Sequence, residues 1–378
     1  MHEGKTGIVL YCPEAFSLFA GGEDGPRSGG AGIAMYHIAN ALAKHDKFEV
    51  AFLFDSEKSQ KLSHPSIQFL SFPRLVQHGV PILSRFVNKA RLHKAIPYSS
   101  PVFITMMDEN VLPIANLAKS IPRSKTIYHV ASDYDVHQPR CVPPEMSAFV
   151  LDLIAESDAV ISQSQHQREM LLASRGKDSF LIRNGWPLEG EPVPSDSREY
   201  TLWVAAIKEH KQPWYFLDLA QVNPDEQFLM IGPPAQESSR SSQLYAYISR
   251  RAEQLPNLIF INRMVAFEET SQYFRKAKCF VNTSEFEGFP NTFVQAMDAG
   301  TPLVSLGVDP DGFIEKAGCG VSAQGDILKF YSEFQRIIRD DDLLSEMGKH
   351  AREYVMENHD IEKTVLSVIE VIDAAQQH

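Results

Sequence analysis

The chain has 378 residues, of which 44% are hydrophobic and 22% charged, a composition typical of a globular protein with two or three domains. Its net charge of −12 argues against general nucleic-acid binding, and no apolar run approaches the roughly 18 residues that a membrane span needs. The four cysteines lie far apart without a CxxC pair, which argues against a zinc or disulfide framework. Because the start of the chain also lacks a signal-peptide pattern, we expect a cytoplasmic protein.

The first elements alternate between strand and helix. Residues 7–12 form a short apolar run typical of a strand, and residues 31–44 carry apolar side chains at helical spacing. Between them, residues 13–30 are predicted to form a long glycine-rich loop. Loops of this length inside compact domains are uncommon and often functional, although a flexible surface loop is the alternative.

The glycines of this loop do not form a dinucleotide-binding turn. Gly30 and Gly32 are followed by Met35 where the GxGxxG pattern requires a third glycine. Asp55, at the end of the next predicted strand, could imitate the acid that binds a ribose. Without the glycine turn, that acid alone does not predict an NAD site.

Residues 58–107 form a basic segment, with seven Lys or Arg residues and no acidic residue. Such asymmetry in an acidic chain favours an anionic partner. Within the segment, apolar and basic side chains share helical spacing, namely Leu83, Phe86, Val87 and Ala90 beside Arg85 and Lys89. The pattern fits a solvated helix packed on its own domain, a helix attached peripherally to the inner face of a membrane, or attraction of a phosphate.

Several further apolar runs in the first half alternate with helical stretches, which predicts a parallel sheet covered on both faces. The runs lie at residues 67–70, 102–105, 126–130, 159–162 and 180–182. Ser164 begins one of the helices with a capping-box pattern, and Gly176 ends it.

Polar residues near the ends of strands are candidates for binding. His129 lies at the end of the 126–130 run, at the edge where such sheets bind ligands. Asp133 and Asp135 form a DxD pattern, as do Asp309 and Asp311, and carboxylate oxygens suit a divalent cation. Neither pair has a supporting ligand cluster in the sequence, so we expect solvated loop carboxylates and no metal.

A second alternating series follows a linker. The proline- and serine-rich residues 189–199 separate a first domain, residues 1–188, from a second, residues 200–358. A terminal helix is predicted over residues 359–378. Strands of the second domain are expected at residues 201–206, 228–231, 258–261 and 279–281, with a helix over 214–221. Two similar α/β domains imply a cleft between them.

Residues 279–306 are predicted to contain a strand, a loop, a helix and a second strand. Pro290 suits the first turn of the helix, and Gly300 lies where a C-terminal glycine belongs. A glycine-bearing loop that opens onto a helix N-terminus exposes backbone N–H groups and a partial positive charge. The stretch is therefore predicted to bind a phosphate.

The same stretch carries a family resemblance. Glu287-Gly288-Phe289-Pro290-Asn291, then Gln295-Ala296-Met297 and Gly300-Thr301-Pro302, resembles the nucleotide-sugar signature of the family 4 retaining glycosyltransferases. The resemblance implies the GT-B fold, in which two Rossmann-like domains face a cleft and the terminal helix can cross back to the first domain. In that family a second glutamate faces the donor where this chain has Gln295, whose amide can still accept a hydrogen bond.

The resemblance also implies roles for single residues. Glu287 and His129 would be the catalytic residues, and Lys211 would bind the donor diphosphate. Ala206 stands where the family has a second phosphate-binding cation, an arginine, and Lys208 could replace it in part. The remaining donor-binding residues implied by the resemblance are Gly29, Gly30, Gly288, Phe289, Pro290, Asn291, Thr292, Gln295 and Arg263.

The expected function is metal-independent transfer of a sugar, with retention, from a UDP- or GDP-linked donor to a glycan or polyprenyl-linked acceptor. The resemblance also implies that the transfer takes place in the assembly of a surface polysaccharide. Two alternatives are a non-catalytic protein that binds a nucleotide sugar or glycan, motivated by Ala206 and Gln295, and an epimerase or phosphorylase of the same architecture. No cofactor is expected in any of these cases.

Overall fold

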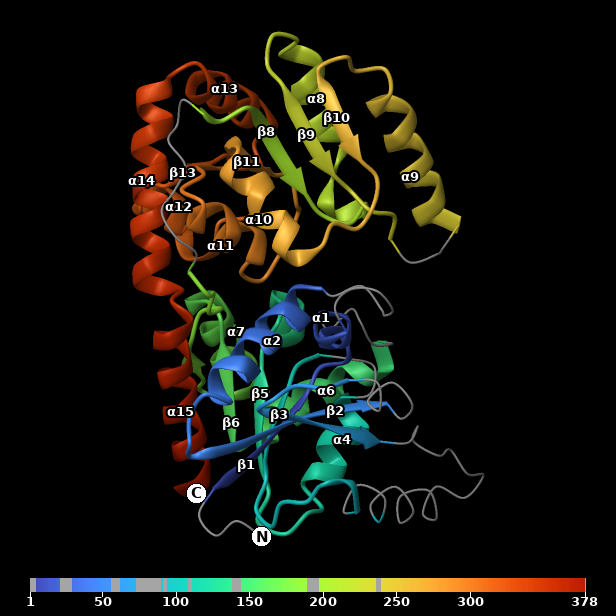
Figure 1. The fold of residues 1–378 in the computed structure, drawn as a ribbon, viewed down its shortest axis with the longest axis vertical. Helices are drawn as coiled ribbons and strands as arrows, with labels where there is room; N and C mark the ends of the chain where they lie inside the picture. Colours follow the sequence, from blue (N-terminus) through green and yellow to red (C-terminus); the bar gives the residue numbers. More distant parts are fainter. Residues whose placement is uncertain are drawn as a thin grey trace. The chain divides into compact units, whose positions relative to one another are not determined.

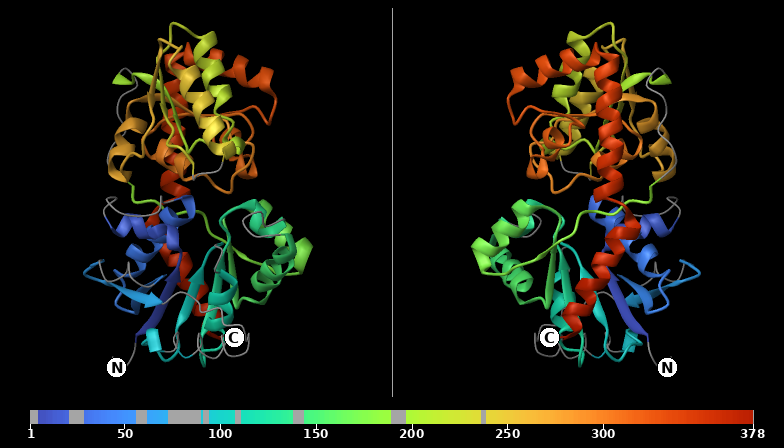
Figure 2. Two further views of the ribbon diagram at one scale, coloured as in Figure 1. Left: turned by 90° about the vertical axis from the view of Figure 1, so that its right-hand side faces the viewer. Right: turned by 90° about the vertical axis from the view of Figure 1, so that its left-hand side faces the viewer.

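The computed structural model describes residues 5–20, 29–55, 62–72, 90, 94–107, 111–137, 144–188, 197–235 and 239–377. The chain divides into two compact units (Figure 1). Unit 1 comprises Met1–Pro187 and Ile361–His378, and unit 2 comprises Leu188–Asp360. Each unit is a parallel sheet with helices on both of its faces (Figure 2).

In unit 1, the described strands form a seven-stranded sheet in the order β3-β2-β1-β4-β5-β6-β7, with every neighbouring pair parallel. The strands are β1 (Thr6–Tyr11), β2 (Phe48–Asp55), β3 (Ile67–Phe72), β4 (Val102–Thr105), β5 (Lys125–His129), β6 (Ala159–Ser162) and β7 (Phe180–Leu181). The inner strands β4 and β6 are buried at every position because helices cover both faces of the sheet.

Except for the last of them, the helices of unit 1 lie between successive strands. They are η1 (Pro13–Ala15), α1 (Phe16–Phe19), α2 (Gly30–Leu42), α4 (Val111–Ala118), α5 (Asp133–His137), α6 (Pro144–Glu156), α7 (Gln165–Arg175) and α15 (Ile361–Gln377). The capping predicted for α7 is confirmed: the Ser164 hydroxyl accepts a hydrogen bond from Gln167 N, and Gly176 has a left-handed φ of 63°.

The terminal helix α15 belongs to the core of unit 1. Its apolar face, which includes Val365 and Val368, is buried with residues of β1 and α2. Ile361 N donates to Trp186 O at 3.1 Å, and a side chain at Gly185 would collide with Ile361 and Thr364. The helix α15 therefore packs in the same hydrophobic core as β1.

In unit 2, the described strands form a six-stranded parallel sheet in the order β10-β9-β8-β11-β12-β13. The strands are β8 (Tyr200–Val204), β9 (Phe228–Ile231), β10 (Leu258–Ile261), β11 (Ala277–Asn282), β12 (Leu303–Ser305) and β13 (Gly320–Ser322). The strands expected at residues 228–231 and 258–261 are confirmed with the same bounds, and those expected at 201–206 and 279–281 are confirmed with shifts of one or two residues at their ends.

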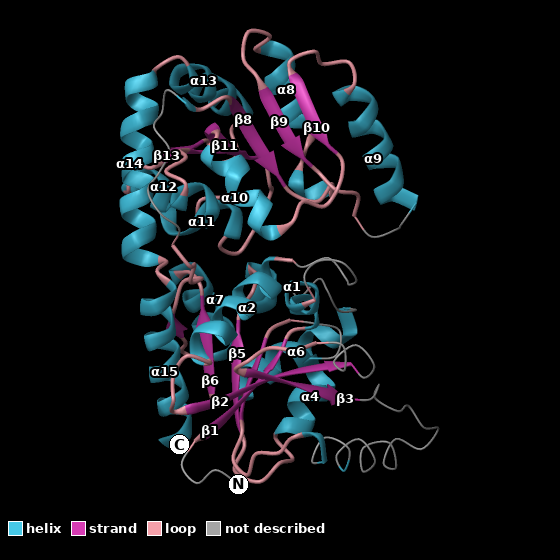
Figure 3. Ribbon diagram, viewed as in Figure 1, coloured by secondary structure: helices cyan, strands magenta, loops and turns pink. Residues whose placement is uncertain are grey.

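Helices cover both faces of this second sheet (Figure 3). They are η4 (Glu209–Lys211), α8 (Trp214–Val222), α9 (Ser239–Ala252), α10 (Phe267–Arg275), α11 (Asn291–Asp298), η5 (Pro310–Gly312), α12 (Phe313–Lys316), α13 (Ile327–Ile338) and α14 (Asp341–Asn358). On one face, Phe228 of β9 packs between Phe216 and Phe334, with ring centroids 5.5 and 5.9 Å away. On the other face, Phe280 packs on Phe293 of α11 at 6.2 Å.

Two guanidinium groups hold the C-terminal end of α11. Arg198 donates to the carbonyl oxygens of Ala299 and Gly300 at 2.8 and 2.9 Å, to Ala277 O at 2.7 Å and to Thr301 Oγ1 at 2.6 Å. From α14, Arg352 donates to the carbonyl oxygen of Asp298 at 2.8 Å and pairs with its carboxylate. Positive charge at this end also complements the helix dipole.

The predicted α/β architecture with parallel sheets is confirmed, but the loop over residues 13–30 is partly wrong. Residues 13–19 are helical because their aromatic side chains pack on β2. The ring centroids of Phe16 and Phe54 are 5.4 Å apart, and those of Phe19 and Phe52 are 5.1 Å apart. The amphipathic stretch predicted around residues 83–90 lies outside the described residues except for Ala90. Among the described helices, none is both long and apolar enough to span a lipid bilayer.

Replacing Arg198 should destabilise unit 2 strongly. In an Arg198→Met variant, buried oxygens at the end of α11 lose their donors, which we expect to lower the free energy of unfolding by about 2–4 kcal/mol. Urea denaturation followed by circular dichroism measures this. The matched control is Arg336→Met, because Arg336 pairs with Glu333 on the surface and should cost less than about 1 kcal/mol. Equal losses in the two variants would contradict the anchoring role.

Candidate functional site

The predicted site residues Lys211 and Glu287 meet in unit 2. Lys211 ends η4, which follows β8, and Glu287 lies in the loop that follows β11. Because β8 and β11 are neighbours in a parallel sheet, their carboxyl ends bring both loops to one edge. Lys211 Nζ forms a short ion pair with Glu287 Oε1, and the two side chains are only 17% and 20% exposed.

Hydroxyl groups fix both members of this ion pair. Ser284 Oγ donates to Glu287 Oε1 at 2.8 Å, and Thr283 Oγ1 donates to the carbonyl oxygen of Lys211 at 2.6 Å. Thr283 Oγ1 in turn accepts a hydrogen bond from Trp203 Nε1 on β8 at 2.9 Å. The carboxylate of Glu287 and the backbone of Lys211 are therefore held in place by their neighbours on the loop after β11.

A second set of contacts joins the same two loops. The His210 ring stacks on the Phe286 ring with centroids 4.8 Å apart, and Glu285 N donates to His210 O at 2.8 Å. The sequence analysis did not identify Ser284, Thr283, His210 or Phe286. Their only signal in the sequence is adjacency to Glu287 or Lys211.

The signature helix α11 begins at Asn291. Pro290 precedes it with an extended backbone instead of lying in its first turn as predicted, and Pro290 O accepts from Phe293 N at 3.0 Å. Gly300 has a left-handed φ of 64°, so the predicted glycine after the helix is confirmed. The first N–H groups of a helix have no partner within the helix, so this end suits an anion.

Side chains around α11 differ in what they could offer a ligand. Phe289 is buried between Phe313 and His359, at 5.1 and 4.5 Å, so its side chain is part of the core. Asn291 and Gln295 are each 8% exposed. Gly288 and Thr292 are partly exposed. Of these residues, Gly288 and Thr292 are thus the ones accessible to a ligand.

The other residues predicted in unit 2 lie apart from the ion pair. Ala206 is partly exposed just after β8. Its methyl group has neither the positive charge nor the hydrogen-bond donors of an arginine. Lys208 is exposed and lines a pocket with residues of α9. Arg263 follows β10 and pairs on the surface with Glu269 at 3.0 Å, a bond that raises the pKa of the guanidinium.

In unit 1, Gly29 and Gly30 lie at the start of α2. Gly29 is the N-cap residue, and a Cβ on it would come within 2.4 Å of a carboxylate oxygen of Glu14. The absence of a side chain at Gly29 thus permits the close approach of an acidic group to this helix N-terminus. Negative charge at that position is favoured by the helix dipole.

His129 ends β5 and is 1% exposed. Burial lowers the pKa of its imidazole to about 4, so the ring is neutral at neutral pH. Its Nδ1 has no hydrogen-bond partner among the described residues. A neutral imidazole carries one donor and one acceptor nitrogen, which suits contact with a sugar hydroxyl.

The DxD aspartates serve local structure. Asp135 is buried and accepts hydrogen bonds from Ala131 N at 2.8 Å and Ser132 N at 3.3 Å, while Asp133 accepts from Gln167 Nε2 at 3.0 Å. Asp309 accepts from Ile314 N at 3.0 Å. Across the described residues, no three His, Cys, Asp or Glu side chains gather as metal ligands.

Comparison with known families places a glycosyltransferase domain on unit 2. Residues 198–340 match the family model described as "Glycosyl transferases group 1". The match contains β8, η4, Glu287 and α11, which are the parts that build the ion-paired site. Among the curated proteins, none matches the sequence significantly.

Solved structures match nearly the whole chain. The sucrose-phosphate synthase of Thermosynechococcus elongatus is similar with a TM-score of 0.76 and 18% identity over 98% of both chains. Anabaena HepE in complex with UDP and glucose gives 0.73 and 14% over 98% of this chain and 100% of that one. Trehalose-6-phosphate from E. coli, bound with UDP-2-fluoro glucose, gives 0.69 and 11% over 98% and 99%.

At these identities the similarity shows the fold. The chain has the GT-B fold of glycosyltransferases, built from two Rossmann-like parallel-sheet units. Its second unit carries a match to group 1 glycosyltransferases, and the site at the edge of that unit's sheet brings together two residues that the sequence predicts for a nucleotide sugar.

The buried Asp135 should give unit 1 a characteristic pH dependence. Burial raises the pKa of Asp135 to about 7, so between pH 4 and 7 the folded chain holds a proton that the unfolded chain has released. Stability from this group is complete at low pH and is lost as the pH rises through 7. Compared with an Asp135→Asn variant, the wild type should therefore gain free energy of unfolding as the pH falls from 8 to 5.

The measurement is urea denaturation of both proteins across this range. His37 and His129, whose pKa values burial lowers to about 4, act in the opposite direction, because the unfolded chain binds their protons first. They are present in both proteins and cancel in the difference. Parallel pH curves for the two proteins would show that Asp135 stays ionised when folded.

Proposed function

We propose that the protein is a retaining glycosyltransferase that transfers a sugar from a nucleoside diphosphate donor to a glycan or lipid-linked acceptor. The single observation that carries the proposal is the ion pair between Lys211 and Glu287 at the carboxyl ends of β8 and β11. It sets an ammonium for a phosphate beside a carboxylate for sugar hydroxyls. The group 1 glycosyltransferase match over residues 198–340 supports the same reading.

In the proposed complex, the donor diphosphate takes Lys211 and the first N–H groups of α11 as its partners. The Lys211 ammonium is then shared between phosphate oxygens and Glu287, which turns toward hydroxyl groups of the donor sugar. Ser284 keeps the carboxylate oriented through its hydrogen bond to Oε1. Fixed donors of this kind stabilise charge on a departing diphosphate without reorganising.

In the proposed reaction, the bond between the anomeric carbon and the phosphate oxygen breaks as the acceptor oxygen bonds to that carbon. The acceptor hydroxyl proton passes to an oxygen of the departing diphosphate. Because acceptor and leaving group share one face of the sugar, configuration is retained. Charge on the leaving group is met by Lys211 and helix N–H groups, so no metal ion is included in the scheme.

The identity of the donor is drawn from the comparisons and the sequence. Two of the similar structures bind UDP or UDP-2-fluoro glucose, which favours UDP over GDP here. Arg263 is proposed to contact the base and His129 the donor sugar. A polyprenyl-linked acceptor, cytoplasmic location and attachment to a membrane through residues 58–107 remain predictions from the sequence.

Two substitutions separate the roles of the ion-paired residues. Lys211→Met should weaken UDP binding by roughly 10- to 100-fold, because the diphosphate loses a charge-assisted hydrogen bond. Glu287→Gln keeps an acceptor for Ser284 but frees Lys211, so UDP should bind at least as tightly as to the wild type. In the same variant, release of UDP from UDP-glucose with an acceptor mixture should fall by about 100-fold or more.

Calorimetry measures the binding, and a coupled assay for UDP measures turnover. The matched control is Glu285→Gln, since Glu285 is exposed in the same loop and contacts η4 only through its backbone N–H. It should leave both quantities unchanged. Weaker UDP binding in Glu287→Gln, or unchanged binding in Lys211→Met, would refute the assignment.

A non-catalytic nucleotide-sugar-binding protein is the second candidate, favoured by Ala206 in place of an arginine. It predicts the same effects of Lys211→Met and Glu287→Gln on binding. It differs in one measurement: a panel of UDP- and GDP-sugars would bind to the wild type with no nucleotide released under any acceptor condition.

A further inference from the structure

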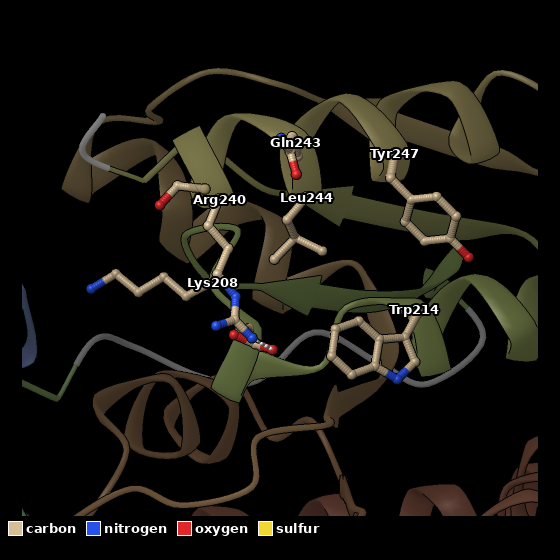
Figure 4. Close-up of a pocket in the computed structure, with 8 residues that line it drawn as sticks. Lys208, Trp214, Arg240, Gln243, Leu244 and Tyr247 are labelled. Carbon is tan, nitrogen blue, oxygen red and sulfur yellow. Dashed lines mark hydrogen bonds and ion pairs between the residues drawn. The ribbon is translucent and has the colours of Figure 1, made fainter. Parts of the chain in front are cut away.

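A pocket of about 400 Å³ lies in unit 2 between η4 and α9. Its volume falls within the roughly 300–1,000 Å³ range of small-molecule sites. It is lined by side chains of η4, the start of α8 and the first turns of α9, among them Lys208, Glu209, Trp214, Arg240, Gln243 and Tyr247. Figure 4 shows Arg240 and Leu244 reaching from α9 toward η4, with the Trp214 ring on the other side.

The pocket is separate from the ion-paired site. The short helix η4 forms the wall between them: Lys208 and Glu209 line the pocket, whereas Lys211 pairs with Glu287 on the other loop. Lys211 N donates to Lys208 O at 3.1 Å, which closes this turn. Neither Glu287 nor Arg263 lines the pocket, so the donor proposed above does not account for it.

Two aromatic rings give the pocket an apolar surface. Trp214 is partly exposed at the start of α8, and Tyr247 is 43% exposed on α9. Leu244 lies one turn before Tyr247 on α9 and also lines the pocket. Flat aromatic faces beside polar side chains such as Gln243 suit a ligand that is apolar on one face and hydrogen-bonding at its edge. A sugar ring has this character.

Positive charge lines the opposite side of the pocket. Lys208 and Arg240 lie there with Glu209, to which Arg240 Nη2 donates at 2.5 Å. Both members of this pair are largely exposed, so the pair is weak and its guanidinium is available to a competing anion. The pocket also adjoins the N-terminal turn of α9, whose dipole adds partial positive charge. With Glu209 among them, the lining side chains carry a single net positive charge, in a chain whose net charge is −12.

We propose that this pocket binds an anionic sugar, with the sugar ring against Trp214 and Tyr247 and its phosphate or carboxylate at Arg240 and Lys208. The site is independent of the proposed transferase chemistry, because it shares no lining residue with the Lys211 and Glu287 pair. It would hold a charged sugar next to η4, outside the proposed transfer site.

The test is titration of the full-length protein with glucose 6-phosphate, N-acetylglucosamine 6-phosphate, glucuronic acid, glucose and inorganic phosphate. Because Trp186 and Trp203 are buried, a ligand in the pocket should quench the fluorescence of Trp214. We expect at least one anionic sugar to bind about tenfold or more tightly than both glucose and inorganic phosphate. The phosphate and carboxylate members of the panel distinguish the two sources of charge.

Three variants locate the binding. Arg240→Gln should weaken binding of the anionic sugar by roughly tenfold or more, and Trp214→Leu should remove the fluorescence change and weaken binding measured by calorimetry. Arg250→Gln is the matched control, because Arg250 is on the same helix but does not line the pocket. It should bind as the wild type does.

Two results would overturn the proposal: no preference of the wild type for any anionic sugar over glucose and inorganic phosphate, or equal affinity in Arg240→Gln and wild type. Measuring UDP with the same proteins keeps the two proposals apart. UDP affinity that is intact in Arg240→Gln and lost in Lys211→Met supports two separate sites. Loss of UDP binding in Arg240→Gln would contradict a separate pocket.

Discussion

The anchoring of α11 is the constraint on which the candidate site depends. A helix of eight residues is too short to be stable by itself, so its direction is set by what holds its ends and its apolar face. Arg198 and Arg352 bind the carbonyl oxygens at its C-terminal end, and Phe293 packs on β11. Burial lowers the pKa of Arg198 to about 10, which still leaves the group charged at neutral pH. The opposite end of α11 is thereby fixed beside the loop that carries Glu287.

The ion pair between Lys211 and Glu287 explains how such a site can exist without a ligand. Two partly buried charges that lacked partners would each be costly, but here each neutralises the other and Ser284 adds a hydrogen bond to the carboxylate. The contacts from Trp203 through Thr283 to the Lys211 backbone keep η4 in place. Preorganisation therefore comes from the loops that follow two adjacent strands, and it is complete within unit 2.

Much of the fold followed from apolar runs and glycine positions, because buried parallel strands and left-handed glycines leave strong local signals. The strands at residues 159–162 and 228–231 and the left-handed Gly176 and Gly300 are examples. The ion pair joins residues 76 positions apart, so only the family resemblance could suggest that Lys211 and Glu287 act together. The helical turns at 13–19 and the anchoring by Arg198 depend on tertiary contacts, which leave no periodic pattern. The aromatic pocket combines η4 with α9, and no motif in the sequence connects them.

The place of α15 in the chain has a consequence for biosynthesis. Its buried residues, including Val365, Val368 and Ile372, complete the hydrophobic core that β1 and α2 begin. A ribosome makes these residues after the whole of residues 188–360. During translation the second unit is thus a continuous segment that can fold first, while the sheet of unit 1 still lacks the part of its cover that α15 supplies. Nascent chains that stall before residue 361 would expose that apolar surface to chaperones or to one another.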